Sequence, residues 1–135
     1  MYQALAATNT SAARTRAAMA GYGRVSLEAR IAGASPHELV LLLYKRLTEL
    51  LREARDAAQN DDILARLKSA ERALVIIDGL DATLDMKRGG SVAKSLRIVY
   101  ELLRARVLST DPADLDAALL SVREIADAWS AIRPA

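Results

Sequence analysis

The chain contains one sharply defined helix start that is followed at once by a dense apolar run. Ser35 is a favoured N-cap residue, Pro36 suits the first helical position because its missing N–H is not needed there, and Glu38 completes the spacing of a capping box. Residues 39–44 then form an unbroken apolar run, and such a run goes more than once around a helix of about 3.6 residues per turn. A helix of this kind buries one side in a core and needs a partner for the remainder.

Length and composition favour one helical domain. The 135 residues are enough for a single core, and a hydrophobic content of 52% without phenylalanine suits close-packed helices better than a sheet. The chain has no cysteine, which excludes disulfides, thiolate nucleophiles and thiolate metal sites. No secretory signal or apolar run of about 18 residues is present. We therefore expect a cytoplasmic protein without membrane insertion.

The positive charge is concentrated before the folded region. Residues 1–35 carry a net charge of +3 within a total of +2, which leaves −1 for the rest of the chain. A nucleic-acid-binding protein would be expected to gather Lys and Arg on one face of its folded body. We therefore expect no nucleic-acid partner.

Two amphipathic helices are predicted in the first half of the folded region. One runs from Pro36 to about Ala58, and the next begins near Asn60 or Asp61. Apolar residues recur in both at helical spacing, so we expect them to point inward. The inward residues are Leu39, Leu43, Leu47, Leu50, Ala54 and Ala57 in the first helix, and Ile63, Leu67, Ala70, Leu74, Ile77 and Leu84 in the second.

Two more helices are predicted in the second half. Ser91, directly after a pair of glycines, is expected to cap the third helix, and Asp111 with Pro112 is expected to open the fourth. Their inward residues are Val92, Leu96, Val99 and Leu103, and then Leu115, Leu119, Val122, Ala126 and Trp129. Short connections make consecutive helices antiparallel neighbours. We therefore predict an all-α fold, an antiparallel up-down-up-down four-helix bundle over residues 35–135, preceded by a flexible segment over residues 1–34.

Candidates for catalysis or metal binding are scarce. His37 is the single histidine, and we expect it to be a solvent-exposed residue of a first helical turn. The Glu-x-x-His pairs of di-iron bundles are absent. Asp78, Asp81 and Asp85 form a carboxylate row that reads as a solvated helix face. We therefore predict neither enzymatic activity, nor a cofactor, nor a metal site.

Each predicted helix carries more apolar residues than its inward stripe requires. Most of the surplus is expected to thicken the core. The remainder indicates apolar grooves between helices, of the kind that accept an amphipathic helix from a client protein. The alternative is a structural bundle that self-associates through the same strips and has no unfolded client.

Several segments together resemble one bacterial family. They are Tyr2, the segment from Tyr22 through the ASP helix start to the leucine-rich LY at Tyr44, IIDGLDATLD at residues 76–85, Gly89-Gly90, VAKSLRIVY ending at Tyr100, and IADAW ending at Trp129. In content and order they are similar to the flagellin-specific export chaperones, the FliS family. The chain departs from the family pattern at Lys45, Arg46, Ser95 and Leu102, so we expect some client contacts to differ.

The resemblance implies a cytosolic chaperone that binds the disordered C-terminal segment of flagellin, prevents premature polymerisation and keeps it competent for export. It also implies contact with components of the export apparatus, and we expect a monomer or weak homodimer. Matching positions in the N-terminal part of the chain are implied to bind the client or occupy its groove: Tyr22, Val25, Leu27, Ile31, Ser35 and Pro36. Candidates that fall beside the inward stripes are Leu42, Tyr44, Leu51, Leu74, Ile76 and Leu80.

Overall fold

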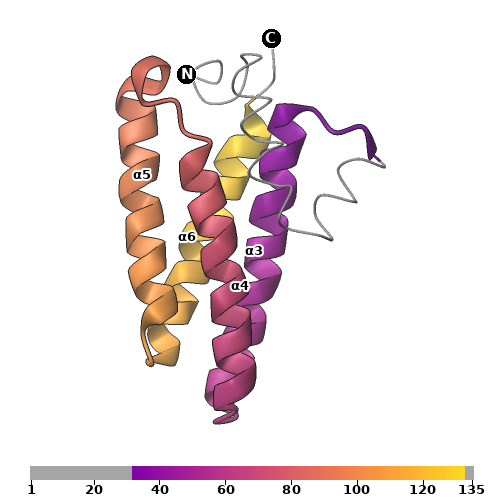
Figure 1. The fold of residues 1–135 in the computed structure, drawn as a ribbon, viewed down its shortest axis with the longest axis vertical. Helices are drawn as coiled ribbons and strands as arrows, with labels where there is room; N and C mark the ends of the chain where they lie inside the picture. The colour runs from indigo at the N-terminus through magenta and orange to yellow at the C-terminus, as the bar shows by residue number, and fades with distance from the viewer. Residues whose placement is uncertain (1–31, 133–135) are drawn as a thin grey trace.

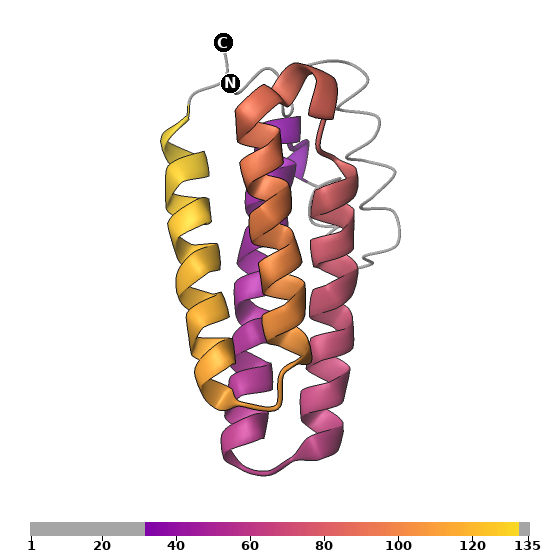
Figure 2. The same ribbon diagram turned by 90° about the vertical axis from the view of Figure 1, so that its left-hand side faces the viewer.

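Four antiparallel helices form a bundle in the computed structural model, which describes residues 32–132. They are α3 (Pro36–Gln59), α4 (Ile63–Ala82), α5 (Met86–Leu108) and α6 (Pro112–Ala131). Each helix packs against the next one in the chain, and α6 packs back against α3 to close the ring (Figures 1 and 2). The predicted all-α four-helix bundle is confirmed, while the predicted flexible segment lies almost entirely outside the described residues.

Short polar side chains cap the starts of the four described helices. The Oγ atom of Ser35 accepts a hydrogen bond from the backbone N–H of Glu38 at 3.2 Å and donates one to the Glu38 carboxylate at 3.0 Å, so the predicted capping box closes through the serine hydroxyl. Asp111 caps α6 directly before Pro112, as predicted. The start of α4 lies slightly later than predicted, because the carboxylate of Asp62 accepts the N–H of Ala65. Acceptors at these positions satisfy N–H groups that have no partner inside the helix.

The predicted start of the third helix at Ser91 is wrong. α5 begins earlier, at Met86, because the carboxylate of Asp85 accepts hydrogen bonds from the backbone N–H groups of Lys87 and Arg88. One helical turn follows before Gly90 interrupts the helix with φ 53° and ψ −130°. Glycine adopts positive φ without a steric penalty. The glycine pair therefore marks a break inside α5 and not its beginning.

The core is centred on α3. Every residue of its predicted inward stripe is buried, and the stripe of α6 is buried except for the half-buried Ala126. α5 contributes fewer fully buried side chains, and three of its predicted inward residues are only half-buried: Val92, Leu96 and Val99. α5 therefore contributes fewer buried side chains to the core than α3 does.

The predicted inward stripe of α4 is partly wrong. Ala70 and Ile77 are buried, but 68% of Ile63 and 53% of Leu67 is exposed. Both views show the physical reason, since the turn between α3 and α4 reaches beyond the turn between α5 and α6 (Figures 1 and 2). The first part of α4 thus extends past the helices that would cover it. Leu84 is buried as expected, although it lies after the end of α4.

Candidate functional site

The carboxylates that could suggest chemistry are engaged in structural contacts. Asp78 accepts hydrogen bonds from Nε and Nη2 of Arg104 at 3.0 and 2.6 Å, and Asp81 accepts one from Nε of Arg97 at 3.2 Å. Asp85 caps α5. The Asp78 side chain is 63% exposed, as expected for a solvated face, but Asp78 and the less exposed Asp81 also join α4 to α5. Among the described residues, no three His, Cys, Asp or Glu side chains cluster so as to hold a metal ion.

The single histidine is buried, contrary to the expectation of a solvent-exposed residue. Only 5% of His37 is exposed, because its ring stacks on Trp129 with centroids 5.0 Å apart and planes 14° from parallel. The indole Nε1 donates a hydrogen bond to the backbone carbonyl of His37 at 3.0 Å. Burial lowers the pKa of His37, while the nearby Glu38 partly opposes this effect. The residue thus joins the start of α3 to the end of α6.

A pair of tyrosines forms a hydrogen bond between two buried side chains. The hydroxyls of Tyr44 and Tyr100 lie 2.7 Å apart, and each side chain is 2% exposed. Burial raises the pKa of Tyr44 to about 12 and that of Tyr100 well above its ordinary value, so both hydroxyls stay protonated. They link α3 to α5 and are inaccessible to a substrate.

The seam between α4 and α5 has two different halves. One half is closed by the ion pairs of Asp78 with Arg104 and of Asp81 with Arg97. On α5, Leu108 follows Arg97 and Arg104 at spacings that keep it on the side facing α4. On α4, Ile63 and Leu67 occupy the corresponding side toward the other end of the helix. The second half of the seam is therefore apolar.

This apolar half is open to solvent. The exposed fractions are 68% for Ile63, 53% for Leu67 and 63% for Leu108. Leu74 lies about two helical turns after Leu67 on α4 and is half-buried. We call these four residues the seam patch. Single exposed apolar residues are common on protein surfaces, but a group of large ones along one seam is typical of a binding site.

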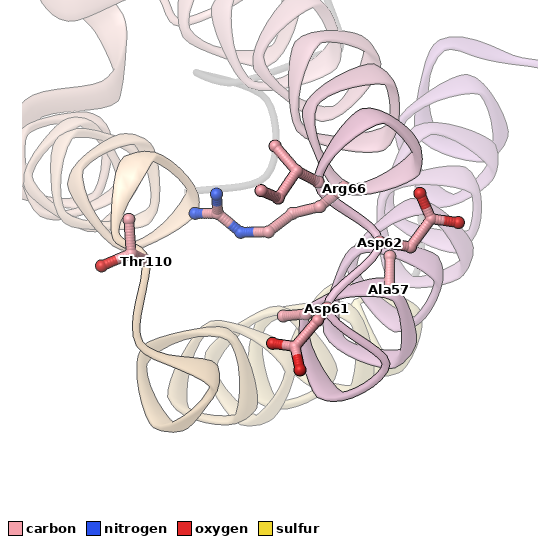
Figure 3. Close-up of a pocket in the computed structure, with 7 residues that line it drawn as sticks. Ala57, Asp61, Asp62, Arg66 and Thr110 are labelled. Carbon is pink, nitrogen blue, oxygen red and sulfur yellow. The ribbon is translucent and has the colours of Figure 1, made fainter.

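A cavity adjoins the seam patch at the end of the bundle. It has a volume of about 250 Å³ and lies between the α3–α4 turn and the α5–α6 turn. Figure 3 shows the side chain of Arg66 reaching from α4 toward the loop that holds Thr110, and its Nη2 donates to the backbone carbonyl of Ser109. The apolar opening is thus bordered by charged groups; the lining residues are Ala57, Ala58, Asp61, Asp62, Ile63, Arg66 and Thr110.

The structure distributes the predicted site residues among several environments. Tyr44, Leu51, Ile76 and Leu80 are buried in the core, with exposed fractions between 0% and 3%. Leu42 and Leu74 are half-buried at its edge, as are the helix-start residues Ser35 and Pro36. Of these residues, Leu74 lies on the seam patch. The four remaining candidates lie outside the described residues: Tyr22, Val25, Leu27 and Ile31.

Sequence reasoning did not identify the exposed residues of the seam patch. Ile63 and Leu67 have the periodicity of core residues, which predicts that they are buried. Their exposure depends on the unequal reach of the two helical hairpins, which local periodicity does not contain. A usable signal was the adjacent pair Ile63-Leu64, because two neighbouring positions differ by about 100° around a helix and cannot both face one narrow core.

No helix in the described part of the chain is both long enough and apolar enough to cross a membrane.

Comparison with known proteins gives consistent matches over most of the chain. The family model described as flagellar protein FliS matches residues 18–135. The flagellar secretion chaperone FliSB of Pseudomonas aeruginosa is 35% identical over 119 residues, which cover 85% of this chain and 94% of the relative. The flagellar secretion chaperones FliS of Salmonella typhimurium and Vibrio cholerae are each 32% identical; they cover 89% and 88% of this chain, and the matches span 93% and 90% of the relatives.

Proposed function

The chain belongs to the FliS family of flagellar secretion chaperones, and from this membership we propose that it binds the C-terminal segment of flagellin through the seam patch. Family membership also identifies the chain as a non-enzymatic, cytoplasmic chaperone, in agreement with the sequence predictions. The observation that carries the proposal is the exposure of Ile63, Leu67 and Leu108 along one seam.

The chemistry of the seam patch suits an amphipathic client helix. Its large side chains run from the first part of α4, which extends past the α5–α6 turn, to the end of α5. An apolar helix face can pack against such a row at every third or fourth residue. Arg66 and Asp62 border the cavity at the end of the patch and provide polar partners for the rim of the client helix. Covering the client's apolar residues in this way would prevent their premature polymerisation.

Reversible binding follows from the state of the client. A segment that is disordered before binding pays an ordering cost in conformational entropy, and this cost limits the affinity per unit of buried area. Release at the export gate then requires only moderate competing interactions. We propose that components of the export apparatus supply them, with the chaperone returning to the cytoplasm.

A calorimetric titration with a peptide spanning the flagellin C-terminus of the same bacterium tests the site. We expect saturable binding with a negative heat-capacity change, because apolar surface is buried. Leu67→Asp and Ile63→Asp should each weaken binding by about 10- to 1000-fold, or about 1.4 to 4 kcal/mol, since they place a charge in the apolar contact. Both positions are exposed, so the variants should remain folded.

The matched control is Leu120→Asp, because Leu120 is 57% exposed on α6, away from the seam. Unchanged affinity in the Leu67 and Ile63 variants would refute the assignment of the site. The family membership would be unaffected by that result.

We also propose that the N-terminal candidates act as an intramolecular placeholder on the client groove. A full-length variant in which Tyr22, Val25, Leu27 and Ile31 are changed to serine removes their apolar contacts. We expect tighter peptide binding, since an internal competitor no longer reduces the fraction of open groove, and increased binding of an apolar dye. Unchanged peptide affinity together with unchanged dye binding would rule the placeholder out.

A further inference from the structure

Acidic side chains border the seam patch. On α4, Glu71 lies four residues after Leu67 and three before Leu74, so it shares their side of the helix. On α5, Glu101 lies two helical turns before Leu108, on the side that faces α4. Both acids are exposed. Apolar and acidic side chains therefore face the same open surface.

A third acid lies at the end of the patch. Asp61 is exposed and lines the cavity together with Ile63. Within the described part of the chain, none of these three acids forms an ion pair. We call them the acidic rim: Asp61, Glu71 and Glu101. Their negative charges are not neutralised by the fold that the structure describes.

The basic side chains near the seam are engaged elsewhere or turned away. In the closed half of the seam, two arginines of α5 already pair with aspartates of α4. Arg66 reaches toward the α5–α6 loop (Figure 3), where its Nη2 donates to the backbone carbonyl of Ser109. Lys68 follows Leu67 by one position, so it is turned by about 100° toward the outer face of α4. The open half of the seam thus presents apolar side chains with a negative border.

Covering the patch changes the environment of these acids. A helix that packs over the apolar side chains removes water from the carboxylates beside them, which costs free energy unless a cation replaces the lost water. Glu71 lies between Leu67 and Leu74, so a matching cation belongs beside the middle of the partner's apolar face. Asp61 requires another beside one end. An acid at either position on the partner would add like-charge repulsion.

We propose that the acidic rim selects client helices that carry Lys or Arg beside their apolar face, with Glu71 as the specificity-determining residue. This inference rests on the proposed function, because it requires the client to cover the seam patch. The apolar side chains supply most of the affinity. The rim favours basic helices over acidic ones and accelerates their association.

Calorimetric titration of the full chain with the flagellin C-terminal peptide tests the role of Glu71. We expect Glu71→Gln to weaken binding by about two- to fivefold at low salt, and Glu71→Lys by about five- to twentyfold. The difference should shrink at about 1 M salt, where the Debye length is about 3 Å. A peptide whose Lys and Arg residues are replaced by Glu should bind Glu71→Lys more tightly than it binds the natural protein.

The matched control is Glu124→Lys on α6. Glu124 is an exposed acid four residues after the exposed Leu120, which repeats the spacing of Glu71 after Leu67 away from the seam. Equal effects of Glu71→Lys and Glu124→Lys would reveal a general effect of net charge and overturn the proposal. Tighter peptide binding by Glu71→Gln would also overturn it, because Glu71 would then hold the chain's own basic N-terminal segment. Helical circular dichroism verifies that each variant is folded.

Comparison with Leu67→Asp separates this proposal from the proposed function. If Leu67→Asp weakens peptide binding and Glu71→Lys does not, the patch binds the client without selecting its charge, and only the present proposal fails. If neither variant changes the affinity, the client binds elsewhere, and the site assignment fails with it. A client segment that has no Lys or Arg beside its apolar face would likewise refute selection by the rim.

Discussion

At the scale of single residues, the hydroxyls of Tyr44 and Tyr100 form a hydrogen bond that is buried in the core. One hydroxyl donates a hydrogen bond to the other at 2.7 Å within an otherwise apolar cluster. A buried polar group without a partner costs more than a formed hydrogen bond contributes, so the two tyrosines depend on each other. This mutual dependence explains how two large polar side chains can occupy the core between α3 and α5.

A double-mutant cycle tests this dependence. Tyr44→Phe and Tyr100→Phe should each lower the free energy of unfolding by about 1 to 3 kcal/mol, because each leaves a buried hydroxyl unpaired. The double variant should cost less than the sum of the two, since it leaves no hydroxyl behind. Urea unfolding of the four proteins measures the coupling. Strictly additive losses would show that the hydrogen bond has no net effect on stability.

At the scale of helices, the ends of α3 and α6 are joined by the stack of His37 on Trp129. The stack excludes water from the imidazole, and burial therefore lowers the pKa of His37 below its ordinary value of 6.5. The unfolded chain takes up a proton near pH 6.5, whereas the folded chain does so only at lower pH. Stability is thus full above pH 6.5 and falls as the pH is lowered through that value.

Replacing the histidine should remove this pH dependence. His37→Phe keeps an aromatic ring against Trp129 but cannot bind a proton, so its stability should change less than that of the natural protein between neutral pH and about pH 5. Urea unfolding at a series of pH values compares the two proteins. All other ionisable groups are the same in both proteins, so the difference between the curves is specific to His37. Parallel curves would exclude His37 as the source.

Capping rules predicted the starts of some helices correctly and failed for others. Ser35 with Pro36, and Asp111 with Pro112, begin α3 and α6 as predicted, because a capping side chain acts on N–H groups within three residues. The start of α5 was mispredicted at Ser91, since Asp85 also caps a turn and Gly90 interrupts the helix after it. Both Asp85 and Ser91 are residues that can cap a helix, and their local sequence does not decide which of them begins α5.

At the scale of the whole molecule, two helical hairpins of unequal reach produce the candidate site. The α3–α4 hairpin extends beyond the α5–α6 turn (Figure 2), so the first part of α4 has no helix over it. Ile63 and Leu67 therefore belong to the surface despite their core-like spacing. Leu108 completes the seam patch from the end of α5. The bundle thus has a solid core and one apolar seam that is open at one end.

The sequence by itself determined the fold class, the starts of α3 and α6 and the buried faces of these two helices, because capping and apolar periodicity act within a few residues along the chain. Only the tertiary structure decided that Asp78 and Asp81 join α4 to α5 through arginines, that His37 is covered by Trp129, and which apolar residues remain exposed. Exposure depends on where neighbouring helices end in space. Residues far apart in the chain set those ends, and no local pattern contains them.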